Sequence, residues 1–281
     1  MRFFIKLAAV AMSAAIVFGC GATLNASETR YNIDEYFTDP AFNRLIRTYD
    51  SNSDGYLTDA EVFAGTRNGY MMSIEDTNIK SLDGLEVLPE LSVISLEVGA
   101  GKIDLSSCKT KYVLIIANDN LKFFVCGSNQ ETVNFLGDCK NLKKAFFNYA
   151  KNLKNMMLSG PSLTGDLCLE NSPKLQRLIV TNTGYKNIYC SDQAKLTQFT
   201  LWGTPLRNLE IPGTGYDDLE LLTISTDGTL NGIYAKGDLA RFLWEHGLFR
   251  PNEYLFYEED GKSYKINNTG YSIMINGKIY D

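Results

Sequence analysis

The feature that most constrains this chain is a pattern of apolar residues that occurs twice, 21 residues apart. In each copy, the spacing of two between the second and third positions is typical of a short strand, and the last three positions carry the chain back along the outside of a coil. A unit this short cannot bury its own apolar residues, so neighbouring units must stack around one core. The pattern therefore predicts a solenoid. Its two copies are Leu175, Leu178, Val180, Tyr185, Ile188 and Cys190, then Leu196, Phe199, Leu201, Leu206, Leu209 and Ile211.

The first three positions of each copy give the spacing L-x-x-L-x-L, which resembles the leucine-rich-repeat superfamily. Residues 79–91 read I-x-x-L-x-G-L-x-x-L-x-x-L and resemble the first repeats of internalin-like proteins. The resemblance covers residues 36–233. It implies an α/β fold, namely a right-handed leucine-rich-repeat solenoid with a curved parallel β-sheet, in a bacterial surface or secreted binding protein. Members of this family share a scaffold and not a single ligand.

We expect the repeat region to span residues 76–234. The unit starts predicted in it lie at Leu91, Lys111, Leu142, Leu175, Leu196 and Leu219. Two gaps, from 111 to 142 and from 142 to 175, exceed the roughly 20 to 29 residues of a leucine-rich repeat. We therefore expect insertions near residues 127–138 and 160–167.

Residues 1–26 are typical of an export signal, with Arg2 and Lys6 before an apolar run that is too short to span a bilayer. Residues 17–20 resemble a bacterial lipobox, in which Cys20 would be lipidated. Ala26 offers an ordinary cleavage site instead, so lipid anchoring and free secretion both stay open. Both alternatives predict an extracellular protein. Contact with the membrane is expected only in the first, through a lipid on Cys20.

A calcium-loop pattern, D-x-[DN]-x-[DN]-G-x5-E, follows an amphipathic stretch at residues 41–49. Calcium prefers oxygen ligands, and a glycine at the sixth position permits the sharp turn of such a loop. We expect residues 31–75 to form an EF-hand-like N-terminal cap with one structural calcium site, because sensors and dockerins normally pair two loops. The predicted ligands are Asp50, Asn52, Asp54, Tyr56 through its carbonyl, Thr58 through a water and Glu61.

Composition excludes several other classes of function. The chain of 281 residues carries a net charge of −6 and no basic cluster, which argues against nucleic-acid binding. Its single histidine, His246, cannot supply the imidazoles of common catalytic zinc sites, and no C-x-x-C pair is present. Five cysteines remain beside Cys20, and we interpret them as small buried core residues, with one disulfide left open.

The last part of the chain, residues 235–281, predicts a C-terminal cap. Residues 238–246 have the pattern of a short helix that ends at Gly247. Two hairpins follow, because Asp260-Gly261 and Asn276-Gly277 separate alternating apolar segments.

Recognition is expected on the outward column of the curved sheet. With the unit starts above, that column contains Ser95, Ile115, Phe146, Ile179, Thr200 and Thr223. Exposed apolar and aromatic patches mark binding sites. We therefore predict ligand binding at Ile115, Phe146, Tyr149, Ile179 and Trp202, although a shift of one residue in the register would turn such a column inward.

The function favoured by the sequence is non-enzymatic binding of an extracellular protein or glycan. No nucleophile-and-base motif, phosphate-binding glycine loop or zinc-protease motif is present in the sequence. One alternative is a calcium-dependent polysaccharide-active enzyme on a parallel β-helix, whose coils have a similar length. Another is a dockerin-like assembly module.

Overall fold

The computed structural model describes residues 29–66, 71–116, 118–191 and 193–211, together with six short strands, β14 to β19, in the last part of the chain. The predicted signal peptide, the lipidation site Cys20 and the helix at 238–246 lie outside the described residues.

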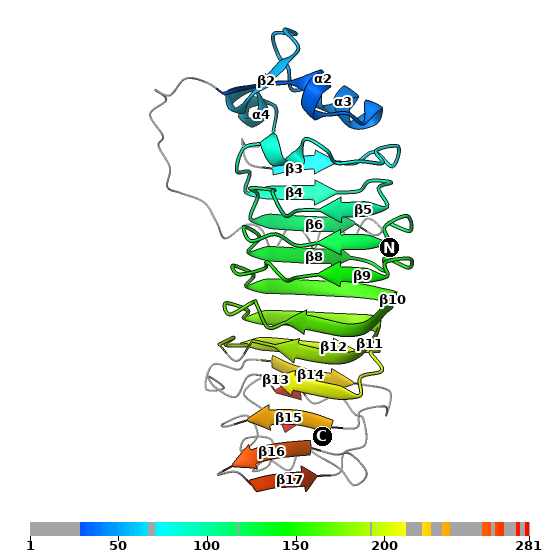
Figure 1. Cartoon of the computed structure of the whole chain (residues 1–281), viewed down its shortest axis with the longest axis vertical. Helices are drawn as coiled ribbons and strands as arrows, with labels where there is room; N and C mark the ends of the chain where they lie inside the picture. The colour runs from blue at the N-terminus through cyan, green and yellow to red at the C-terminus, as the bar shows by residue number, and fades with distance from the viewer. Residues whose placement is uncertain are drawn as a thin grey trace.

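A small helical segment lies at the end of the stack of coils next to β3 (Met71–Ile74; Figure 1). Its helices are the three α-helices of the described residues, and each begins at a side chain that accepts backbone N–H groups: Asn32, Asp39 and Thr58. A short antiparallel pair, β1 with β2, holds the segment together. Its elements are β1 (Arg30–Asn32), α2 (Ile33–Tyr36), α3 (Pro40–Ile46), β2 (Tyr56–Thr58) and α4 (Asp59–Gly65).

The rest is a stack of coils in which parallel strands lie on two faces (Figure 1). The first face comprises β3 (Met71–Ile74), β4 (Val93–Leu96), β6 (Tyr112–Ile116), β8 (Thr132–Leu136), the first parts of β10 (Asn155–Leu169) and β11 (Arg177–Cys190), β12 (Gln198–Trp202) and β14 (Leu221–Ser225). We call these strands the first sheet.

The second face begins with a three-stranded parallel sheet, β5 (Lys102–Asp104), β7 (Phe123–Val125) and β9 (Lys144–Phe146). The later parts of β10 and β11 pair in parallel and continue into β13 (Asn208–Ile211), β15 (Gly232–Lys236) and β16 (Leu255–Glu259). We call all of these strands the second face. A single 3-10 turn, η1 (Leu85–Val87), precedes β4.

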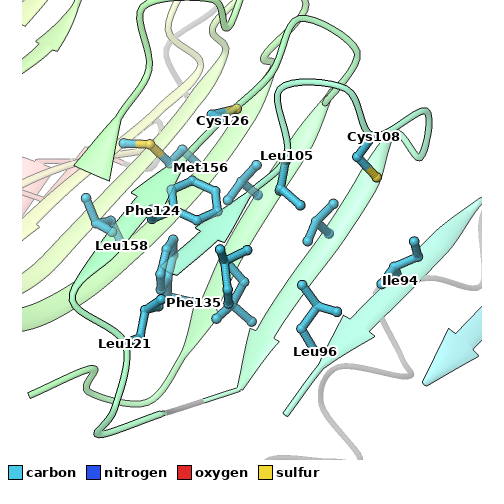
Figure 2. Close-up of a cluster of buried hydrophobic side chains, with 14 of the residues drawn as sticks. Ile94, Leu96, Leu105, Cys108, Leu121, Phe124, Cys126, Phe135, Met156 and Leu158 are labelled. Carbon is cyan, nitrogen blue, oxygen red and sulfur yellow. The ribbon is translucent and has the colours of Figure 1, made fainter. Parts of the chain in front are cut away.

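The core lies between the two faces and runs through successive coils (Figure 2). In the repeated pattern, every position from Leu175 to Leu206 is buried, as predicted. The preceding coil repeats the same arrangement with Leu153, Met156, Leu158, Leu163, Leu167 and Leu169, all buried. The prediction of a repeat solenoid with one continuous core is therefore confirmed.

The predicted insertions are wrong. Strand pairing aligns Met72, Ile94, Val113, Val133, Met156, Leu178 and Phe199 in one column, so each coil between them contains 19 to 23 residues. Residues 127–138 and 160–167 belong to regular coils. Polar residues, Thr110 and Gln130, occupy the first position of the pattern in two successive coils, and both are buried. Residues 160–167 belong to the next coil, which begins at the buried Leu153.

Gln130 replaces a leucine because it binds the backbone at a corner of the coil. Its Oε1 accepts a hydrogen bond from the N–H of Gly127 at 2.7 Å, and its Nε2 donates to the carbonyls of Cys108 and Thr110, both at 3.1 Å. A buried backbone group without a partner is costly, so the side-chain amide stabilises the corner.

The fold class is confirmed only at the level of a parallel β-solenoid. The return segment of each coil, which the sequence places along the outside, forms strands from β5 onward. The α-helices of the described residues are confined to the N-terminal segment. Antiparallel strands flank both predicted hairpin turns, β16 with β17 (Lys262–Ile266) and β18 (Met274–Ile275) with β19 (Ile279–Tyr280), and the turn residues themselves lie outside the described residues. Their role as a cap stays a prediction.

Asp39 joins the helical segment to the first coil. One carboxylate oxygen accepts the N–H groups of Ala41 and Phe42 at 2.9 and 3.0 Å, and the other accepts those of Lys80 and Ser81 at 2.8 and 3.1 Å. Burial alone would raise the pKa of Asp39, but these four bonds outweigh it and the pKa lies below its ordinary value.

Phe37 and Gly84 complete this junction. A Cβ on Gly84, where φ is +99°, would lie 2.6 Å from the Phe37 ring, so only glycine permits this approach. The ring of Phe37 in turn packs edge to face with Phe42, with 5.3 Å between centroids. Asp39 and Phe37 therefore pack the helical segment against residues of the first coil.

Asp39→Ala is expected to lower the free energy of unfolding by about 3 kcal/mol, because it removes a helix cap and leaves four N–H groups without their acceptor. Urea unfolding at pH 7 measures the change, with exposed Asp119→Ala as the control. Since the folded pKa of Asp39 lies below the unfolded one, its contribution is full above the unfolded pKa and is lost as pH falls through the folded pKa. Equal stability of the two variants at pH 7 would contradict this role.

Gln130→Leu restores the residue that the repeat pattern expects, yet we expect it to destabilise the chain by about 2 kcal/mol. The change removes the acceptor of a buried N–H and a donor to two carbonyls. Thermal and urea unfolding measure the difference. A more stable variant would show that the corner needs only apolar volume.

Candidate functional site

The predicted calcium loop connects α3 to α4 and is closed by its own side chains. Asp50 is buried, and its two oxygens accept the N–H groups of Asp54 at 3.2 Å and of Gly55 at 2.9 Å. Asn52 and Asp54 each accept an N–H two residues further along, both at 2.9 Å. Gly55 has φ +81°, which permits the sharp turn. The first three predicted ligands therefore lie along one tight turn.

Glu61 ties the two ends of the loop together. Its Oε2 accepts from the N–H and the hydroxyl of Thr58 at 3.0 and 2.8 Å, which makes a capping box at the start of α4. Its Oε1 accepts from the N–H and hydroxyl of Ser51 at 3.1 and 3.2 Å. Burial alone would raise the pKa of Glu61, but the bonds from Thr58 and Ser51 lower it below its ordinary value.

The guanidinium group of an arginine lies beside the loop. Arg30, on β1, forms an ion pair with Asp54, and its guanidinium lies 4.6 Å from the centroid of the Tyr56 ring. The pairing of β1 with β2 places Asn32 opposite Tyr56 and fixes this geometry. Arg30 therefore supplies positive charge beside one of the predicted ligands.

The chemistry of the loop fits calcium, because its side chains offer carboxylate and amide oxygens within one turn. Groups of the protein itself nevertheless occupy these oxygens. Ser51 and Thr58 donate hydrogen bonds to the two oxygens of Glu61, and Arg30 forms an ion pair with Asp54. In the part of the chain that the structure describes, no group of three or more His, Cys, Asp or Glu side chains is arranged to hold a metal ion. Calcium binding stays a prediction.

The expectation that Ile115 is exposed is wrong. Its side chain is 0% exposed and faces the core, while Leu114 and Ile116 on either side are half-buried and face outward. The physical reason is a shift of one residue, because this coil begins at Thr110 and not at Lys111. Alternation along a strand then turns every neighbouring side chain to the other face.

Phe146 and Tyr149 are exposed, at 40% and 61%, but they are not on the expected sheet. Phe146 lies on β9 of the second face, and Tyr149 lies in the turn that follows. Ile179 and Trp202 do lie on the first sheet: Ile179 is half-buried, and Trp202 is 52% exposed at the end of β12. The five predicted residues therefore divide between the core and two separate surfaces.

Strand pairing shows which residues form the outward row of the first sheet. Leu114 and Met157 occupy this row, and the sequence reading missed both of them. The spacing of about 20 residues between Val113, Val133 and Met156 could have found them, because it fixes the phase of each strand. The complete row is Ser95, Leu114, Asn134, Met157, Ile179 and Thr200.

Cys108, Cys126, Cys139 and Cys168 are free, and Cys108, Cys126, Cys139 and Cys190 are buried as expected. Burial raises the pKa of Cys126 to about 12. Cys168 is exposed, and its pKa is raised by partial burial and by Glu170 and Asp166. The buried thiols are therefore core residues and not nucleophiles.

No protein-family model matches this sequence, and none of the curated proteins compared with it is significantly similar. None of the helices in the described ranges is long and apolar enough to cross a membrane. The structure itself defines the class: a parallel β-solenoid with a helical segment at its N-terminal end.

Cys168 is expected to react with iodoacetamide first among the five cysteines, because reaction needs access as well as thiolate. Peptide mapping of the native protein at pH 8 measures the order. Cys126 is expected to react only after unfolding, because its side chain is buried and burial raises the pKa of its thiol. Labelling in denaturant, where all five become equivalent, is the control; rapid native labelling of Cys126 would contradict the burial.

Proposed function

We propose that this chain is an exported binding protein of the leucine-rich-repeat type, which recognises an extracellular protein or glycan and catalyses no reaction. The observation that carries the proposal is the outward row of the first sheet, where Leu114, Met157 and Ile179 lie on hydrogen-bonded strands and Trp202 lies nearby. Their partial exposure leaves apolar surface facing solvent.

The geometry of this row favours recognition of an extended surface. Strands of a sheet lie about 4.8 Å apart, so the row presents side chains at regular intervals on a rigid frame. Buried neighbours on both sides of each outward residue fix its position. Aromatic anchors such as tryptophan are among the side chains that contribute most to binding energy, and the aliphatic residues around them exclude water.

The calcium loop is proposed to stabilise the N-terminal end and not to switch it. Asp50, Asn52, Asp54, the carbonyl of Tyr56, Thr58 through a water, and Glu61 would hold the ion. The oxygen donors and the turn at Gly55 support this proposal. Binding would require Glu61 to exchange its hydrogen bonds with Ser51 and Thr58, which is consistent with a weak extracellular site with a dissociation constant of about 10⁻⁴ to 10⁻³ M.

Millimolar calcium is expected to raise the thermal midpoint of the wild-type chain by a few degrees, because an ion that binds only the folded state stabilises it. Asp50→Asn is expected to abolish this shift, whereas Asp83→Asn, which lies outside the loop, is expected to keep it. Differential scanning calorimetry with calcium, magnesium and chelator measures the effect. An unchanged midpoint in wild-type protein would contradict the calcium proposal.

Trp202→Ala is expected to weaken ligand binding about tenfold or more, because an exposed aromatic anchor is lost. The probes are a panel of polysaccharides, mucins, cell-wall fragments and host-surface proteins immobilised for surface plasmon resonance. Phe63→Ala on α4, an aromatic residue that is 36% exposed, is the matched control. Saturable binding that is unchanged in Trp202→Ala and in Ile179→Glu would contradict the proposed face.

A second candidate is a polysaccharide-active enzyme on a parallel β-helix. The observation that favours it is the presence of parallel strands on both faces of each coil. The two candidates differ in whether a bound polysaccharide is cleaved. New reducing ends or unsaturated sugars released from an acidic polysaccharide would support the enzyme and overturn the non-enzymatic proposal.

A further inference from the structure

The N-terminal half of the second face carries an unusual combination of lysines and phenylalanines. We call it the lysine–aromatic face and define it by the exposed residues Lys102, Lys122, Phe123, Lys143, Lys144 and Phe146 of β5, β7, β9 and the corners before them. Phe123 is 41% exposed and Phe146 40%. It lies apart from the outward row of the first sheet, so it is independent of the binding proposed above.

Strand pairing places three of these residues in one row across the strands. Lys102 is paired with Phe123, and Phe123 with Lys144, so that Phe123 lies between two lysines across the strands. Val125 and Phe146 are paired in the neighbouring row and extend the apolar surface. At about 4.8 Å per strand, Lys102 and Lys144 originate about 10 Å apart.

The charges of this face are largely unneutralised. Asp104, the exposed acid of the same strands, pairs with Lys102 at 2.8 Å. Among residues 29–66, 71–116, 118–191 and 193–211, none of Lys122, Lys143 and Lys144 forms an ion pair. Positive charge therefore gathers here on a chain whose net charge is −6. Such a patch attracts anionic partners.

An acidic polysaccharide matches this arrangement better than a nucleic acid does. Each lysine can bind a carboxylate or sulfate, and the apolar face of a sugar ring packs on a phenylalanine. Two strand spacings are comparable to the length of two sugars in an extended chain, so charges on alternate sugars would meet Lys102 and Lys144. A nucleic acid binds mainly through many phosphate contacts, and the four lysines of this face, with no arginine among them, offer few such contacts.

We propose that the lysine–aromatic face binds an extended acidic polysaccharide, bearing uronate or sulfate groups, that runs along the axis of the solenoid. Lys102, Lys122 and Lys144 bind its anionic groups, and Phe123 packs against a sugar ring between Lys102 and Lys144. Phe146 and Tyr149 continue the contact surface.

Affinity electrophoresis and calorimetry with the full chain test this proposal, with polygalacturonate and heparin as probes and neutral dextran for comparison. Binding is expected to at least one acidic probe, and to weaken steeply between low and high salt. The double variant Lys122→Glu and Lys144→Glu is expected to weaken it by about tenfold or more. Phe123→Ala is expected to weaken it several-fold without changing its salt dependence.

Matched controls separate a specific face from general electrostatics. Lys195→Glu changes the charge of an exposed lysine in the turn before β12, and Phe63→Ala removes an aromatic residue of similar exposure on α4. Both are expected to keep the affinity within about twofold. Circular dichroism and thermal unfolding verify that each variant is folded.

Three outcomes would overturn the proposal. They are the absence of binding to both acidic probes, equal or tighter binding of oligodeoxythymidylate, and an equal loss of affinity in Lys195→Glu. Trp202→Ala belongs to the other surface and is expected to leave binding of the acidic probe unchanged. Failure of the lysine–aromatic face is therefore distinguishable from failure of the first-sheet proposal.

Discussion

Every part of this structure depends on an apolar core that no coil can form alone. The strands of one coil are short, as in β4 with four residues and β5 with three, and their inward side chains are covered only when the next coil stacks on them. The hydrophobic driving force is therefore shared between neighbours. A coil at the end of the stack has a neighbour on one side only, and the first coil is joined to the helical segment by Asp39 and Phe37.

The second constraint is the backbone at the corners, where the chain turns from one face to the other and cannot continue the strand ladder. Asn118 donates to the carbonyl of Ala100 at 3.1 Å and accepts from Asn120, and Gln130 performs the same task one coil later. Buried polar residues in a solenoid are thus explained by hydrogen bonds to an adjacent turn. These hydrogen bonds also allow a coil with a polar residue in place of the leucine to stack in the same way as the other coils.

These two constraints explain what the sequence predicts and what it does not. The stacking of coils and the buried positions of the repeated unit follow from apolar spacing, and both are confirmed at Leu178 and Phe199. The starting positions of the coils at Thr110 and Gln130 cannot be predicted from the apolar spacing. Polar side chains occupy these positions, and Gln130 binds backbone groups there, so the apolar pattern is interrupted. That error moved Ile115 from the core to the surface and moved Phe146 to the wrong sheet. The turn around Asp50 could be predicted because its hydrogen bonds join residues close in sequence. The ion pair of Asp54 with Arg30 could not, because Arg30 lies 24 residues earlier in the chain, on β1.

Alternation along the strands separates the requirements of folding from those of binding. Inward residues must fill the core, whereas their outward neighbours are free to vary, so each face of the solenoid can carry its own chemistry on the same frame. Leu114 and Met157 give the first sheet an aliphatic row, while Phe123 and Lys144 give the second face charge and aromatic surface. Because both rows cross the strands at the same regular spacing, the fold is suited to ligands that extend along the stack, and a coil added or removed would change the length of the bound segment without disturbing the contacts of the others.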